Sequence, residues 1–148
     1  MVTARRFKAI GVVHSPFKKA ADIPMEMNVD PRGFEGTESE IALFADFEPG
    51  LKDIDGFSHL IVVFAFHVSE DGRLLVKPPF ETELRGVFAT RSPHRPNPIG
   101  VTVVKLLGRT GPILRVSGLD AVEGTPVLDI KPYTQKDQKT DVRTGWIK

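Results

Sequence analysis

The chain has 148 residues, of which 41% are hydrophobic and 26% charged, and a formal net charge of +1. These values are typical of one globular domain that encloses a core, and they exclude a strong overall basic field for attracting nucleic acids. The absence of cysteine excludes disulfides, thiolate nucleophiles and cysteine metal ligands. The four histidines lack metal-ligand spacing, so we expect no metal. No apolar run is long enough for a signal peptide or a membrane span, so we expect a cytoplasmic protein without membrane contact.

Short apolar segments, several of them alternating, predict about eight strands and no long helix. The first strand is expected at 6–13 and the second at 37–44, with Ile41 and Leu43 on one face. The unbroken hydrophobic run at 57–66 predicts a strand that is buried on both faces. Further strands are expected at 74–77, 87–90, 99–107, 113–117 and 125–130, with a helical turn at 48–54 and a hairpin turn at 108–112.

Two polar segments lie outside these strands. Residues 14–36 are rich in Pro, Gly, Asp and Asn, and connections of this length are usually functional or mobile. Within them Met25, Met27 and Phe34 fit either a pocket cover or small anchors onto the core. The tail at 134–148 begins with a polar stretch at 134–144 that we expect to be ordered only by a partner.

The predicted elements favour a barrel or sandwich over a parallel α/β sheet. No glycine-rich loop follows a strand and opens a helix, which disfavours Rossmann and P-loop nucleotide binding. We therefore predict a mainly β fold, a small β-barrel with short helices and long loops. It forms a single domain over 1–148 whose core covers about 6–133.

The most informative segment is GVFATRSPHRPNPIG at 86–100. Its beginning predicts the end of a buried strand. Ser92, Arg95 and Asn97 each precede a proline, which pushes them toward extended geometry and leaves the loop few shapes. A stiff loop holds Arg91 and Arg95 with little entropy left to lose, which suits an anionic or carboxylate-bearing ligand. The alternative is a structural turn whose arginines pair with acidic neighbours.

Three other segments concentrate polar groups beside turns, at 14–17, 58–60 and 119–126. If their strand ends meet in space, they line one cleft together with the loop that carries Arg91. His59 stands where the most hydrophobic strand begins. It fits either a hydrogen-bonded core residue or a catalytic group.

Asp120 and Glu123 lie in a turn that contains glycine. They fit ordinary turn chemistry, or carboxylates that bind ribose or an amine or accept a proton. His94, Lys18 and Lys19 fit surface positions or phosphate contacts. The residues predict a pre-shaped site with cationic and acidic groups, but they leave its reaction open.

Four segments occur in a familiar order: GVVHSPF at 11–17, GFSHL at 56–60, FATRSPHRPNPIG at 88–100 and LDAVEGTPVLDIKPY at 119–133. Over about 7–133 the chain resembles the TsaA/TrmO-like family, S-adenosylmethionine-dependent tRNA (adenine-N6)-methyltransferases. The resemblance implies a small β-barrel that forms a homodimer. It also implies methylation of N6 of N6-threonylcarbamoyladenosine at position 37 of tRNA.

The resemblance further implies that S-adenosylmethionine lies in a cleft near the dimer interface. The implied cofactor contacts are Ser15, Pro16, Phe17, His59, Leu60, Arg91, Val101, Asp120, Ala121, Val122, Glu123 and Gly124. For catalysis, Asp120 or Glu123 is the expected proton acceptor, with His59 behind them.

The resemblance also implies substrate contacts by four side chains. Arg91 or Arg95 is expected to bind the threonyl carboxylate. Lys131 is expected to contact the tRNA backbone and Tyr133 to stack on a base. Bacterial members usually carry an additional C-terminal domain, so here a dimer or a separate partner is expected to extend the RNA surface. Two alternatives remain: a non-catalytic module that binds S-adenosylmethionine or a nucleotide, and a methyltransferase for another RNA or a small molecule.

Overall fold

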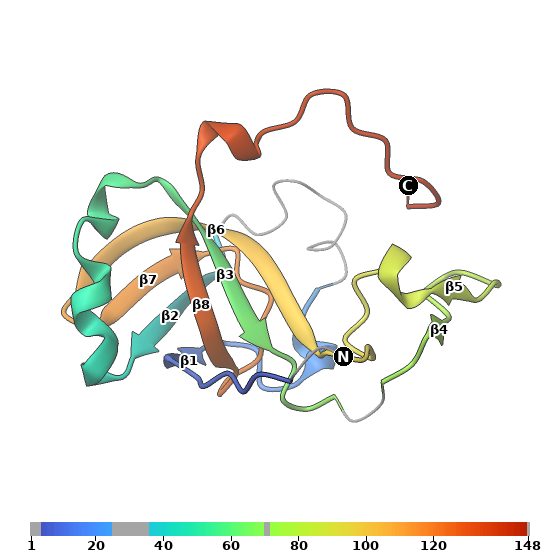
Figure 1. Ribbon diagram of the computed structural model, residues 1–148, viewed down its shortest axis with the longest axis horizontal. Helices are drawn as coiled ribbons and strands as arrows, with labels where there is room; N and C mark the ends of the chain where they lie inside the picture. Colours follow the sequence, from blue (N-terminus) through green and yellow to red (C-terminus); the bar gives the residue numbers. More distant parts are fainter. Residues whose placement is uncertain (1–3, 25–35, 70–71, 148) are drawn as a thin grey trace.

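The computed structural model describes residues 4–24, 36–69 and 72–147. Six antiparallel strands close a barrel in the order β1-β2-β7-β6-β3-β8 (Figure 1). Their bounds are Gly11–His14 for β1, Glu38–Leu43 for β2, His59–Ala65 for β3, Ile99–Thr110 for β6, Ile113–Ser117 for β7 and Pro126–Pro132 for β8. A small second sheet pairs β4, Leu75–Val76, with β5, Arg85–Gly86, and stands beside the barrel as an arm (Figure 1). The predicted mainly β barrel is confirmed.

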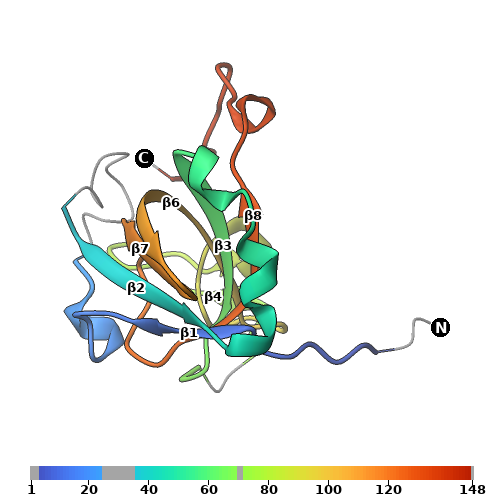
Figure 2. The ribbon, with the colours of Figure 1, turned by 90° about the vertical axis from the view of Figure 1, so that its left-hand side faces the viewer.

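Short 3₁₀ helices connect the strands. Their bounds are Ala20–Asp22 for η1, Ala45–Leu51 for η3, Ile54–Gly56 for η4, Val87–Ala89 for η5 and Gln135–Asp137 for η6. The predicted helical turn at 48–54 corresponds to η3 and η4, which form one column beside the barrel in Figure 2. Among the described residues no helix has the length and apolar character to cross a membrane.

Alternation along the strands builds the core, because successive side chains of a strand point to opposite faces. In β3, Leu60, Val62 and Phe64 are buried, while the residues between them are only half-buried. The prediction of burial on both faces was therefore wrong for β3: its outward face is covered incompletely by the rest of the chain. In β2, Ile41 and Leu43 are both buried, as predicted.

The largest differences from the predicted elements are found in three places. The first strand begins only at Gly11 rather than at residue 6, and Phe7 is exposed. The predicted strand at 87–90 is instead the single turn η5, which closes because Thr90 donates its N–H and its hydroxyl to the Val87 carbonyl. The predicted turn at 108–112 is largely strand, since β6 continues to Thr110 past a bulge near Gly108.

The barrel has two rims, which we name after a residue on each. The Arg91 rim holds the ends of β1, β3 and β7 and the starts of β2, β6 and β8. The His59 rim holds the opposite ends of the same strands. In Figure 1, β3 runs down to the Arg91 rim and β8 runs up from it. The two rims are about 20 Å apart along β3, at about 3.3 Å per residue.

Candidate functional site

Two of the three polar segments meet at the Arg91 rim, where β1 ends and β8 begins. Glu123 accepts a hydrogen bond from His14 Nδ1 to Oε1 at 2.8 Å and one from the Ser15 backbone N–H to Oε2 at 3.1 Å. The Glu123 N–H donates to the Phe17 carbonyl at 2.7 Å, and the Gly124 N–H donates to the Val13 carbonyl at 2.9 Å. The segments at 14–17 and 119–126 therefore form one hydrogen-bonded unit.

These hydrogen bonds determine the charge of Glu123. The hydrogen bond from His14, followed by that from the Ser15 N–H, lowers the pKa of the Glu123 carboxyl below its ordinary value of 4.5. Glu123 is consequently a carboxylate at neutral pH and a weaker base than an ordinary glutamate. This suits it to bind a cation or a hydroxyl group.

Glu123→Gln is expected to lower the free energy of unfolding at pH 7, and the deficit should shrink as the pH falls. Because folding lowers the pKa of Glu123, its stabilising contribution is complete above the unfolded-state pKa and disappears as the pH falls through the folded pKa. Urea unfolding of both proteins at pH 7 and pH 3 measures the deficit. A deficit of equal size at the two pH values would contradict this assignment.

Apolar side chains that point into the barrel core anchor the turn that carries Asp120 and Glu123. Leu119 and Ala121 are 0% and 2% exposed and belong to the barrel core. Between them, Asp120 is half-buried and accepts a hydrogen bond from the Thr102 hydroxyl on β6 at 2.5 Å. Val122 packs against Phe17. The position of the Asp120 carboxylate is thus fixed by its buried neighbours in the turn and by the hydrogen bond from Thr102 on β6.

The loop between η5 and β6 joins the same rim. The Phe66 N–H donates to the Pro98 carbonyl at 2.8 Å, and the Ser69 hydroxyl donates to the Pro93 carbonyl at 3.0 Å. Arg95 Nη1 donates to the carbonyls of Thr90 and Ser92 at 3.0 and 3.1 Å. The Arg95 side chain therefore stabilises its own loop through this one nitrogen.

Arg91 behaves differently from Arg95. It is exposed and forms no hydrogen bond or ion pair with any residue in the described ranges. A guanidinium on a fastened loop without an internal partner has its donors available to a ligand. The geometry therefore favours the ligand interpretation for Arg91.

Sequence reasoning missed His67, which follows the end of β3 at the Arg91 rim. A methyl group added to Gly124 would stand 4.0 Å from His67 Nε2. His67 therefore borders the turn that contains Glu123. The sequence does show that His67 follows the end of a hydrophobic strand. To place that strand end at the same rim as Glu123, however, one must know the order and direction of the strands.

The third polar segment, at 58–60, lies at the His59 rim. His59 Nδ1 is 2.8 Å from the Ser58 hydroxyl, and the His59 ring is 6.0 Å from that of Tyr133, centroid to centroid. The Leu60 side chain is fully buried, so only its backbone is open to a ligand. Within one chain, His59 and Leu60 do not meet the Glu123 turn, and the expected single cleft is not formed.

The remaining predicted site residues occupy the outside of the barrel. Val101 on β6 is 54% exposed. Lys131 on β8 forms an exposed ion pair with Asp129 at 2.9 Å. Pro16 is exposed between the two buried residues of its segment, Ser15 and Phe17. Each has an accessible surface.

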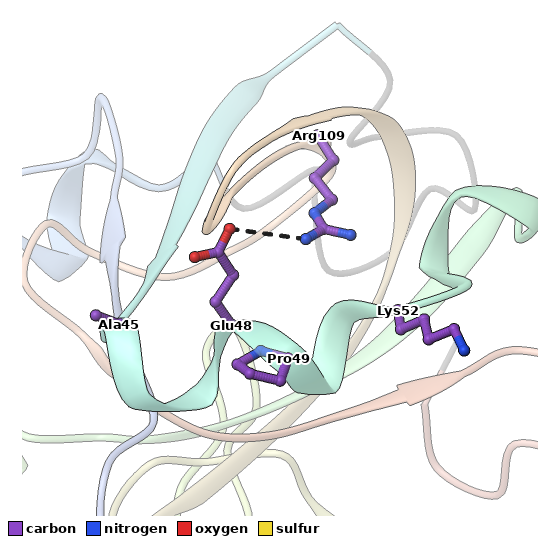
Figure 3. A pocket seen from close by; sticks show the side chains of 5 residues that line it. All are labelled: Ala45, Glu48, Pro49, Lys52 and Arg109. Carbon is purple, nitrogen blue, oxygen red and sulfur yellow. Dashed lines mark ion pairs between the residues drawn. The ribbon is translucent and has the colours of Figure 1, made fainter.

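A depression of about 430 Å³ lies beside η3, away from the Glu123 turn (Figure 3). Its Arg109 is 3.8 Å from Glu48 and donates to the carbonyls of Gly111 and Leu51 at 2.9 and 3.2 Å. The guanidinium therefore fastens the β6-β7 hairpin to η3, and we assign this depression a structural role. No group of three histidine, aspartate or glutamate side chains suited to a metal occurs among the described residues.

The tail has contacts within the chain. The Trp146 indole N–H donates to the Ala89 carbonyl at 2.8 Å, and the Arg85 guanidinium lies 5.2 Å from the centroid of the Trp146 ring. These contacts lie beyond 134–144, for which ordering by a partner stays a prediction. Residues 25–35, with Met25, Met27 and Phe34, lie outside the described ranges.

Comparison with known proteins places this arrangement in a family. Residues 12–138 match the model of the tRNA-methyltransferase O N-terminal domain. The chain is 46% identical over 142 residues to a probable S-adenosyl-L-methionine-binding protein of Pyrococcus abyssi, covering 95% of this chain and 75% of the relative. It is 38% identical over 138 residues to the tRNA (adenine(37)-N6)-methyltransferase of Escherichia coli, covering 86% and 57%.

The solved structures agree with the sequence comparison. The crystal structure of TrmO from Pseudomonas aeruginosa matches with a TM-score of 0.78 and 34% identity, covering 97% of this chain and 62% of that one. The chain thus spans less than two thirds of the Escherichia coli and Pseudomonas aeruginosa proteins. By the extent of the family match and the shared barrel, the chain belongs to the tRNA-methyltransferase O N-terminal domain family.

Proposed function

We propose that the protein is an S-adenosylmethionine-dependent methyltransferase that methylates N6 of N6-threonylcarbamoyladenosine at position 37 of tRNA. The observation that carries the proposal is the Arg91 rim: Glu123 is ionised there, His67 borders its turn, and the loop that carries Arg91 is hydrogen-bonded to Phe66 and Ser69 on either side of His67. The relatives named as S-adenosylmethionine-binding proteins and as tRNA (adenine(37)-N6)-methyltransferases support it.

The donor set of the Arg91 rim fits S-adenosylmethionine. This molecule carries a sulfonium and an ammonium, a carboxylate and a ribose, so it needs an anion, a cation and hydrogen-bonding groups. Glu123 supplies the anion, Arg91 the cation, and the backbone of the turn further donors and acceptors. We propose that these residues hold it, with His67 added to the predicted set. Within this set, the predicted cofactor contacts at 15–17 lie next to those at 120–124, because hydrogen bonds join the two segments.

When bound, S-adenosylmethionine supplies an electrophilic methyl group on sulfur. The N6 nitrogen of the substrate is a weak nucleophile because its lone pair is delocalised, so alignment by the rigid turn contributes to the rate. The nitrogen must also lose a proton. We assign its acceptance to Asp120, whose carboxylate is oriented by Thr102. Glu123 is less suited to this role because its pKa is lowered.

The substrate also carries a threonyl carboxylate. We propose that it binds donors of the loop at 91–98, with Arg91 presenting a guanidinium that has no partner among the described residues and Arg95 fixing the loop. Lys131 and Tyr133 stay proposed contacts of the tRNA backbone and of a base. Because tRNA is the substrate, we place the protein in the cytoplasm.

A second copy of the chain is proposed to complete the site. The outward face of β6 exposes Ile99 and Val101, the hairpin of β4 and β5 exposes Phe80 by 91%, and η5 exposes Phe88 by 77%. Apolar surface of this extent is typical of an interface. Light scattering is expected to give the mass of two chains, and a monomer at micromolar concentration would contradict a shared cleft.

Methyl transfer tests the proposed function. The protein is incubated with S-adenosylmethionine labelled in its methyl group and with tRNA that carries or lacks the threonylcarbamoyl group. Label is expected in N6 of the modified adenosine only. Binding of S-adenosylmethionine without transfer to either tRNA would instead support the non-catalytic module, and equal transfer to both would point to a different acceptor.

A further inference from the structure

The His59 rim carries a groove of about 870 Å³ that is separate from the proposed cofactor site. The groove lies between η4, the start of β3 and η6, and its lining includes Phe57, His59, Tyr133, Gln135, Lys136 and Gln138. Because it is at the opposite end of β3 from Glu123, it is a separate site within one chain.

Aromatic rings form one wall of this groove, and the backbone holds them in place. The Tyr133 N–H donates to the His59 carbonyl at 3.2 Å, and the two rings are inclined by 57°. Ser58 restrains the His59 ring through its hydroxyl. Phe57 adds a third ring, 36% exposed. Pre-positioned rings of this kind stack on unpaired nucleic acid bases at little entropic cost.

The charges around the groove favour an anion. Lys136 lines it, and Lys105 on β6 is the register partner of His59 on β3. The acid of η6, Asp137, is directed to the helix start, where it accepts from the Thr134 N–H at 2.9 Å. No carboxylate lines the groove among the described residues; the nearest acids in the sequence, Asp53 and Asp55, lie on or beside η4 outside the lining. The exposed amides of Gln135 and Gln138 are suited to base edges.

From this combination we infer that the groove binds a single-stranded segment of RNA, with at least one base stacked on Tyr133. This inference rests on the proposed function, because it names the RNA as the same tRNA substrate. It adds a contact to a nucleotide other than the one that is methylated, since the two sites are at opposite rims. A duplex is not the expected ligand, because its bases are already stacked and paired.

The test uses the full chain and a fluorescein-labelled single-stranded oligouridylate, with fluorescence anisotropy as the readout. Tyr133→Ala is expected to weaken binding by about 5- to 150-fold, the range for the loss of one base–aromatic stack. Tyr133→Phe retains the ring and should bind as the unaltered chain does. Lys136→Ala should reduce the slope of log affinity against log salt by about 0.7, the value for one phosphate contact on a single strand.

A parallel calorimetric titration with S-adenosylmethionine separates this inference from the proposed function. Tyr133→Ala should leave S-adenosylmethionine binding unchanged. Absence of oligouridylate binding, or equal binding by Tyr133→Ala, would overturn the groove assignment even if methyl transfer to tRNA is observed. Loss of S-adenosylmethionine binding in a folded Tyr133→Ala protein would also overturn it and assign the groove to the cofactor. Oligouridylate binding without any S-adenosylmethionine binding would support the groove while contradicting the proposed reaction.

Discussion

Arg91→Ala is expected to weaken binding of S-adenosylmethionine by about 1.5–3 kcal/mol, or roughly 10- to 150-fold, as for a lost hydrogen bond to a charged group. The reason is that hydrogen bonds within the chain fix the loop, while the Arg91 guanidinium on this loop is exposed. The fold should be unaffected, because Arg91 has no partner among the described residues to lose. Calorimetric titration measures the affinity, and the unfolding midpoint checks stability.

Two further variants sharpen this result. Arg91→Lys keeps the charge but loses the planar pair of donors, so its affinity should fall between those of the unaltered chain and Arg91→Ala. Arg6→Ala removes an exposed arginine that precedes β1 and serves as the control. Unchanged affinity in Arg91→Ala would remove this side chain from the cofactor site and restore the interpretation of the loop as a structural turn.

Asp120→Asn is expected to lower kcat for methyl transfer by about 10²- to 10⁴-fold, the usual contribution of a general base. Asparagine retains an oxygen that accepts from Thr102, so the turn keeps its geometry while the proton acceptor is lost. Binding of S-adenosylmethionine should therefore persist. Single-turnover kinetics with saturating cofactor on threonylcarbamoylated tRNA measures the rate of transfer.

The control is Asp46→Asn, which removes an exposed carboxylate of η3 that lies outside the proposed sites. This variant should turn over as the unaltered chain does. If Asp120→Asn transfers methyl groups at full rate while Glu123→Gln does not, the roles of the two carboxylates are exchanged in our proposal.

The barrel was predictable because its signals are local. Alternation in β2 places Ile41 and Leu43 in the core, and the proline-rich sequence after η5 indicates a loop. The grouping of polar segments was predictable only in part. Whether a residue at a strand end reaches a given rim depends on strand direction and pairing order, and these are set by contacts between distant segments.

His59 and His67 illustrate this limit. His59 begins the hydrophobic strand β3 and His67 follows its end, and the local sequence pattern does not show which of the two lies near Glu123. The pairing of β3 with β8 and β6 brings the residue after the strand to the Glu123 turn and the residue at its start to the Tyr133 groove. The short turn η5 was missed for a related reason, since its apolar sequence fits a strand and the Thr90 hydrogen bonds alone close it.

Hydrogen–deuterium exchange with and without S-adenosylmethionine tests the central claim most directly, because it locates the bound molecule on one rim or the other. Our account predicts slower amide exchange in 14–17, 66–69, 91–98 and 118–125, with the backbone at 56–60 and 133–138 unchanged apart from any dimer contact. Protection confined to 56–60 and 133–138, or none at saturating S-adenosylmethionine, would contradict the assignment of the cofactor site to the Arg91 rim.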